Sequence, residues 1–145
     1  DADLVPEGLN EDVISSATHV LFSQPALKEF AAGKSTEKAL NYAMELNRGW
    51  VGVTEGSSGT RWLDKGSLRH FPAFEVKTVD TLGAGDVFHG AFATFIHKKK
   101  TIQESVELAT ATASLKCTKF GGIRSVPNYK LVKQFAKRIK TSIVE

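Results

Sequence analysis

Apolar residues in the first half of the chain form short runs separated by a segment with helical periodicity. The run 19–22 is short and bulky, which favours a buried strand. From 36 to 47 the apolar positions recur at helical spacing, and a glycine at 49 follows the end of that helix. The run 50–54 again predicts a buried strand. Strand, helix and strand in this order predict a parallel crossover and an α/β fold.

Shorter elements surround this unit. Asn10 followed by two acids predicts a short helix over 10–18, and the sequence at 23–25 ends the first strand and begins another helix, since proline is tolerated in a first turn. The alternating runs 60–63 and 67–71 have a glycine in their connection, which suggests a β-hairpin inserted after the crossover.

The second half of the chain is predicted to be helical. One helix begins at the glycine loop near Gly83 and runs to about His97, and another begins at Thr101, where Thr101 and Glu104 form a capping-box pattern. The segment 128–143 has apolar residues at intervals of four and lysines between them, which predicts an amphipathic terminal helix. We find no internal repeat, low-complexity segment or interdomain linker.

Composition narrows the class of protein. The 145 residues are 41% hydrophobic and 24% charged, which suits one globular domain with a real core. The net charge of +3 is mildly basic but forms no continuous stripe, so no nucleic-acid partner is expected. A single cysteine, Cys117, excludes an internal disulfide and fits a reducing compartment. No membrane span or signal peptide is recognisable, and we expect a cytoplasmic protein without a membrane partner, although the chain begins at Asp1 without a methionine.

The segment from Val79 to Gly90 carries the candidate chemistry. Glycines at 83 and 85 stand just before a helical pattern, so backbone N–H groups can converge on an anion at the positive end of the helix dipole. Asp86 follows them and could accept the proton of an attacking hydroxyl. Converging amides suit a phosphoryl group in transfer, because its negative charge is spread over equatorial oxygens.

The pattern by itself leaves two interpretations open. It is neither a Walker A loop nor Gly-x-Gly-x-x-Gly, so it supports only an anion site beside a carboxylate. The alternative is a tight glycine turn in which Asp86 merely favours the helix dipole.

Three blocks of this sequence carry a resemblance to a known family. The first is Asp-Thr-Leu-Gly-Ala-Gly-Asp at 80–86, the second is the glycine-containing turn at 53–59, and the third comprises 116–122 and the Ser-Val-Pro at 125–127. Together they resemble the ribokinase (PfkB) family of sugar kinases, in which 80–86 matches the family signature and 53–59 its nucleotide-side Thr-x-Gly-x-x-Gly turn. The resemblance covers about residues 19–140, with details closest to sulfofructose kinase and fructokinase-like members. It implies a three-layer ribokinase-like α/β fold with a mostly parallel sheet, of which residues 1–145 are the carboxyl-terminal, nucleotide-binding and catalytic part.

The resemblance also implies roles for residues. Asp86 would deprotonate a primary hydroxyl of a ketose or related sugar, and the amides of Gly83, Ala84 and Gly85 would stabilise the γ-phosphoryl group of ATP. The ATP phosphates and ribose would be bordered by Thr54, Gly56 and Gly59. Mg²⁺ would accompany ATP. A monovalent cation such as K⁺ would be held by backbone oxygens, and the matching positions are Asp80, Leu82, Lys116, Lys119, Gly121 and Ser125.

Two departures from the family pattern stand out. Where the family places Asn-x-x-Glu to organise Mg²⁺, this chain has Ser23-Gln24-Pro25-Ala26, without a carboxylate. The amino-terminal half, which supplies the sugar-binding residues and a β lid that can form a homodimer, is missing from this chain. We therefore expect the chain alone to be inactive.

Other candidate residues have simpler interpretations. His89 is expected to be packed rather than catalytic, and the other histidines lack the spacing of a metal site. Cys117 is expected to be a buried small hydrophobe, and Trp50 and Trp62 to be core aromatics rather than an adenine site. Two alternative functions remain: a nucleoside or sugar-phosphate kinase of the same fold, and a non-catalytic nucleotide-binding module.

Overall fold

The computed structural model describes residues 11–143, and the side chains of 11–137. The chain divides into two compact units, residues 1–72 and 73–145, and each unit is described by itself. The expected cap at Asn10 lies outside the described residues.

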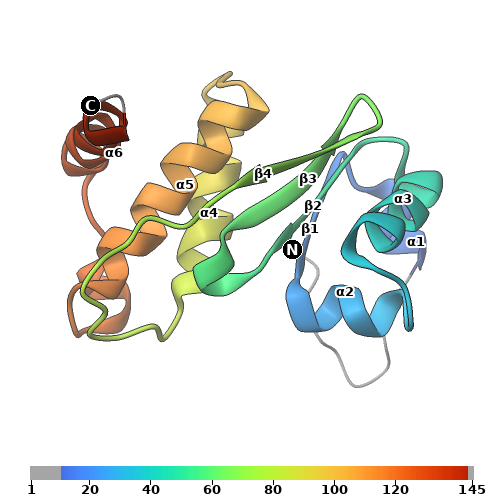
Figure 1. Ribbon diagram of the computed structural model, residues 1–145, viewed down its shortest axis with the longest axis horizontal. Coiled ribbons are helices and arrows are strands. Elements are labelled where there is room, and N and C mark those ends of the chain that lie inside the picture. The colour runs from blue at the N-terminus through green and yellow to red at the C-terminus, as the bar shows by residue number, and fades with distance from the viewer. Residues whose placement is uncertain (1–10, 144–145) are drawn as a thin grey trace. The chain divides into compact units, whose positions relative to one another are not determined.

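The first unit is a four-stranded sheet with helices (Figure 1). Its strands are β1 (His19–Ser23), β2 (Trp50–Thr54), β3 (Thr60–Asp64) and β4 (Ser67–Phe71), in the order β1-β2-β3-β4. Its helices are α1 (Glu11–Ser16), α2 (Gln24–Phe30) and α3 (Thr36–Asn47), with a 3₁₀ turn, η1 (Gly56–Ser58). The strands β1 and β2 pair in parallel with His19 opposite Trp50, so the predicted crossover through α3 is confirmed.

The remaining two strand pairings of this sheet are antiparallel, and the pairing of β3 with β4 is the predicted hairpin. Strand β3 pairs with β2 and then with β4, where Asp64 lies opposite Ser67. The connection is only Lys65 and Gly66, which have φ of 50° and 79°. Two positive φ values match a two-residue turn whose twist suits the flanking strands. Among the residues that the structure describes, one of the three strand pairings is therefore parallel.

The core of the first unit lies between β1, β2 and the helices α1, α2 and α3, which lie on the same side of the sheet (Figure 1). Phe22, Leu40, Val51 and Val53 are fully buried in it. Burial of such side chains stabilises the unit by roughly 1.5–3 kcal/mol each. This core fixes the carboxyl ends of β1 and β2, where the turn after Thr54 begins.

The second unit consists of helices. They are α4 (Ala84–His97), α5 (Ile102–Cys117) and α6 (Tyr129–Ile143), with a 3₁₀ turn, η2 (Gly122–Ser125), between the last two. The predicted capping box is confirmed: Glu104 N donates to Thr101 Oγ1 at 3.2 Å, and Thr101 N donates to the Glu104 carboxylate at 3.0 Å. Helices α4 and α5 pack side by side, while Ala111 of α5 packs with Val132 and Ala136 of α6. None of the helices within 11–143 is long and apolar enough to span a bilayer.

Candidate active site

The glycine loop ends where α4 begins. Gly83 is the N-cap of α4 and has φ of 71° and ψ of 14°, a left-handed conformation that favours glycine. The first helical hydrogen bond runs from Val87 N to Gly83 O at 3.0 Å. The amides that precede Val87 therefore have no partner within the helix and lie at its positive end. Of these, Ala84 N donates to the Thr81 carbonyl at 3.0 Å.

Asp86 lies in the first turn of α4 and is exposed. It lines a pocket of about 710 Å³ within the second unit, together with Leu82, Gly83, Lys116 and Gly122. The carboxylate follows the loop closely, since its Oδ2 lies 3.7 Å from the position that a Cβ on Gly83 would occupy. The loop, the carboxylate and a lysine of α5 thus face one hollow.

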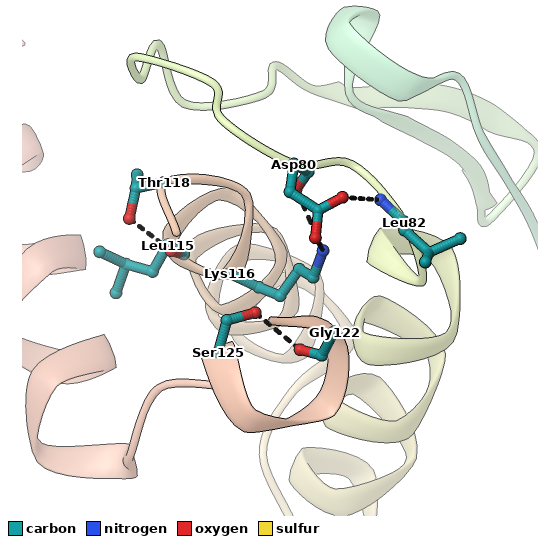
Figure 2. Close-up of polar contacts among 7 residues, drawn as sticks. All are labelled: Asp80, Leu82, Leu115, Lys116, Thr118, Gly122 and Ser125. Carbon is teal, nitrogen blue, oxygen red and sulfur yellow. Dashed lines mark hydrogen bonds and ion pairs between the residues drawn. The ribbon is translucent and has the colours of Figure 1, made fainter. Parts of the chain in front are cut away.

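An ion pair between Lys116 and Asp80 holds the backbone just before the glycine loop. Figure 2 shows the side chain of Lys116 extending from α5 toward Asp80. Its Nζ donates to the main-chain oxygen of Asp80 at 3.0 Å and lies 3.3 Å from Asp80 Oδ2. Asp80 Oδ1 accepts a hydrogen bond from Leu82 N at 3.0 Å. This amide, and after it the Lys116 ammonium, lower the pKa of the Asp80 carboxyl, which stays ionised.

The six positions matched to cation ligands make different hydrogen bonds in the structure. Asp80, Leu82 and Lys116 come together as described. The Lys116 carbonyl accepts from Lys119 N at 3.3 Å, and the Gly121 carbonyl accepts from Arg124 N at 3.1 Å. The hydroxyl of Ser125, a buried residue, donates to the Gly122 carbonyl at 2.6 Å (Figure 2).

In the first unit, the turn after β2 holds the three positions matched to the nucleotide. Thr54 is the last residue of β2, and its Oγ1 donates to the Phe22 carbonyl at 3.3 Å. Gly56 and Gly59 have φ of 57° and 96°, and Glu55 N donates to the Gly59 carbonyl at 2.8 Å, which closes the turn. The carboxyl end of a parallel strand pair is where α/β sheets bind ligands.

A buried carboxylate anchors the same turn. The Glu55 side chain is 4% exposed and lies 3.3 Å from Arg61 Nε on β3. It also accepts a long hydrogen bond from Thr36 Oγ1 at 3.5 Å. The guanidinium compensates a charge that would otherwise be costly to bury.

The sequence comparisons identify the family. A family model described as pfkB family carbohydrate kinase matches residues 6–129. The chain belongs to the pfkB family of carbohydrate kinases. Among its relatives, the ribokinase of Lactococcus lactis subsp. lactis is 37% identical over 91 residues, which are 63% of this chain and 30% of the relative.

Solved structures of family members have the same fold. The ribokinase of Thermotoga maritima has a TM-score of 0.83 at 34% identity, over 93% of this chain and 48% of that one. A fructokinase variant of Vibrio cholerae O395, solved with fructose, ADP and a potassium ion, has a TM-score of 0.77 at 26% identity, over 86% of this chain and 42% of that one. The ribokinase-like α/β fold is thus confirmed, and the chain spans less than half the length of these relatives.

As a member of this family, the chain departs from the pattern at Ser23. In the structure Ser23 Oγ caps α2 by accepting from Ala26 N at 3.3 Å. Within the described part of the chain, no three histidine, cysteine or acidic side chains gather closely enough to hold a metal ion. At this position Ser23 is thus the N-cap of α2.

The remaining candidates take the simpler roles in the structure. Trp50 and Trp62 are buried, which confirms them as core aromatics. Cys117 is buried too, and desolvation raises the pKa of its thiol, so it suits a small hydrophobe. The His89 ring is half-buried and meets Phe88 edge-on at 6.0 Å between ring centroids.

The role of the Lys116 side chain was not predicted from the sequence. The sequence placed Lys116 at the site only through its backbone oxygen, whereas its ammonium is the group that contacts Asp80. The available signal was its place in α5, because the neighbouring Cys117 and the small residues one turn earlier are buried.

Proposed function

We propose that the protein to which this chain belongs transfers the γ-phosphoryl group of ATP to a primary hydroxyl of a ketose or related sugar. The observation that carries this proposal is the exposed Asp86 carboxylate in the first turn of α4, lining one pocket with Gly83. Family membership supports the reaction class, since the relatives are named ribokinase, deoxyribokinase and fructokinase.

Asp86 would act as the general base. A carboxylate beside the hydroxyl can take its proton as the oxygen attacks phosphorus, which avoids building positive charge on the attacking oxygen. The exposure of Asp86 leaves its oxygens accessible to a substrate in the pocket. Geometry therefore favours Asp86 over the half-buried His89 one turn later.

The loop amides would stabilise the phosphoryl group. The amides of Gly83, Ala84 and Gly85 precede the first helical hydrogen bond and lie at the positive end of α4. The Ala84 amide donates to Thr81 in this structure, so a phosphoryl oxygen must share or replace that bond. Each such donor contributes on the order of 3 kcal/mol of transition-state stabilisation in enzymes that use them.

Thr54, Gly56 and Gly59 would border the phosphates and ribose of ATP. The closed turn between Glu55 and Gly59 presents backbone groups rather than charged side chains, which suits a polyanion that already carries its metal. Mg²⁺ keeps several waters and binds substrate phosphates with few protein carboxylates. We propose that it arrives with ATP and is held mainly by phosphate and water, since Ser23 replaces the family's metal-organising motif.

The decisive experiment is Asp86→Asn in the full-length protein. We expect turnover to fall by about 10²–10⁴-fold, because the amide cannot accept the proton, while ATP affinity measured by calorimetry stays within about twofold. Glu75→Gln removes an exposed carboxylate from the same unit and serves as the matched control. Turnover of Asp86→Asn within tenfold of wild type would contradict the base assignment.

The acceptor and the alternatives are tested with the same protein. Labelled ATP offered with ketoses, pentoses, nucleosides and sugar phosphates separates the proposed sugar kinase from a nucleoside or sugar-phosphate kinase. Binding of ATP without transfer to any of them would favour a non-catalytic nucleotide-binding module. The homodimer and the cytoplasmic location stay predictions.

A further inference from the structure

We propose that the ammonium of Lys116 takes the place of the monovalent cation expected beside the glycine loop, so that the protein works without added K⁺. The inference builds on the proposed kinase function and concerns how the loop is held. Its basis is a fully buried lysine whose Nζ lies against two oxygens of Asp80 (Figure 2).

The burial of Lys116 requires an explanation. Lysine is almost never fully buried unless it is paired, because its charge loses its hydration. Lys116 has no exposed side-chain surface, and the Asp80 carboxylate beside it is only 13% exposed. The ammonium thus occupies a position where a desolvated positive charge is compensated by one carboxylate and one carbonyl oxygen.

These oxygens belong to Asp80, one of the positions matched to the cation. An ammonium group and a dehydrated monovalent cation both bind carbonyl and carboxylate oxygens, and Asp80 offers one of each. A free cation entering here would meet the Lys116 charge at the same oxygens, and like charges at such short range repel strongly. The residues present therefore do not fit a second monovalent cation at Asp80.

The placement also suits the role. Asp80 comes three residues before Gly83, and its Oδ1 holds the Leu82 amide at 3.0 Å, so the ion pair fixes the backbone that leads into the loop. Lys116 lines the same pocket as Gly83 and Asp86. A tethered ammonium supplies a positive charge there at every salt concentration, whereas a bound ion does so only in proportion to its occupancy.

Thermal stability tests the inference without relying on turnover. A ligand that binds only the folded state raises its stability as the ligand concentration rises. The full-length protein is heated in KCl and in choline chloride at equal ionic strength. We expect the two Tm values to agree within about 1 °C, whereas a K⁺-specific rise of several degrees would overturn the inference. This result is decisive even if the kinase assay fails.

Substitution of the lysine gives the complementary test. Lys116→Ala removes the ammonium and leaves Asp80 with room beside it, and we expect turnover to fall about tenfold or more in choline chloride and to recover severalfold in KCl or methylammonium chloride. Lys116→Met fills the space without charge, so the same salts should not restore it. Lys130→Ala, an exposed lysine of α6, is the control for loss of a charge.

The outcomes separate clearly. Equal turnover of Lys116→Ala in choline and potassium salts, at the wild-type level, would refute the inference. If Lys116→Ala does not fold, the comparison of wild-type Tm in the two salts decides. A wild-type turnover that rises severalfold with K⁺ would likewise refute it, since the tethered charge would then not suffice.

Discussion

Replacement of Gly83 by alanine should destabilise the protein, whereas the same replacement of Gly85 should not. Gly83 has φ of 71°, and a left-handed conformation costs an L-residue roughly 1–2 kcal/mol. A Cβ there would lie 3.7 Å from Asp86 Oδ2, which is ordinary contact, so backbone strain is the whole cost of Gly83→Ala. Gly85 lies inside α4, and a Cβ there meets nothing within 4 Å. Gly85→Ala should therefore be neutral or stabilise by up to about 1 kcal/mol.

The assay is thermal unfolding of the full-length variants. At about 2–4 °C per kcal/mol for a protein of this size class, Gly83→Ala should lower Tm by about 2–8 °C, and Gly85→Ala should leave it unchanged or raise it slightly. Gly83→Asn is the matched control, since asparagine tolerates the left-handed region and should lose less than alanine. Equal Tm values for the two alanine variants would refute the assignment of strain to Gly83.

Activity should order the same variants differently. The open space beside Gly85 is where we place the phosphoryl group, so its added methyl should lower turnover by about tenfold without loss of stability. A stable Gly85→Ala protein with full turnover would show that phosphate does not approach this face of the loop.

Two further predictions concern ion pairs. Arg61→Met leaves the buried Glu55 carboxylate without its guanidinium and should lower the unfolding free energy by about 1–3 kcal/mol. Arg69→Met breaks an exposed ion pair and should change the unfolding free energy by less than about 1 kcal/mol. Urea unfolding of the two variants tests this difference. The amide of Thr101, and after it Lys100, depress the pKa of Glu104, so its stabilisation is present above the ordinary value of 4.5 and is lost as pH falls through the lower folded value. Glu104→Gln should therefore lose less Tm than wild type between about pH 5 and pH 3, and an identical loss would contradict this.

Secondary structure was predicted well where a few neighbouring residues determine it. The hairpin followed from alternation and a glycine, and the capping box from two residues three apart, because each is a short-range effect that the surrounding fold does not change. The terminal helix was predicted over 128–143 and begins at Tyr129, with the Asn128 side chain accepting from Leu131 N. The 3₁₀ turns η1 and η2 were not foreseen, since tight turns of this kind leave little periodicity to detect.

The site was predictable only in its contiguous part. Gly83, Gly85 and Asp86 stand together in the sequence, so one motif revealed them. The Lys116 ammonium reaches Asp80 across 36 positions, and only the packing of α5 decides that its side chain points inward rather than to solvent. A lysine usually places its charge in water, and the family resemblance matched this one only through its backbone oxygen.

Among the described residues, β1 is an edge strand of the sheet, and β2 is its neighbour. Three of its five residues, Val20, Leu21 and Phe22, are buried and apolar. An edge strand can pair with a further strand, either from the same polypeptide or from another molecule. We therefore expect these 145 residues alone to self-associate through the β1 edge as their concentration rises.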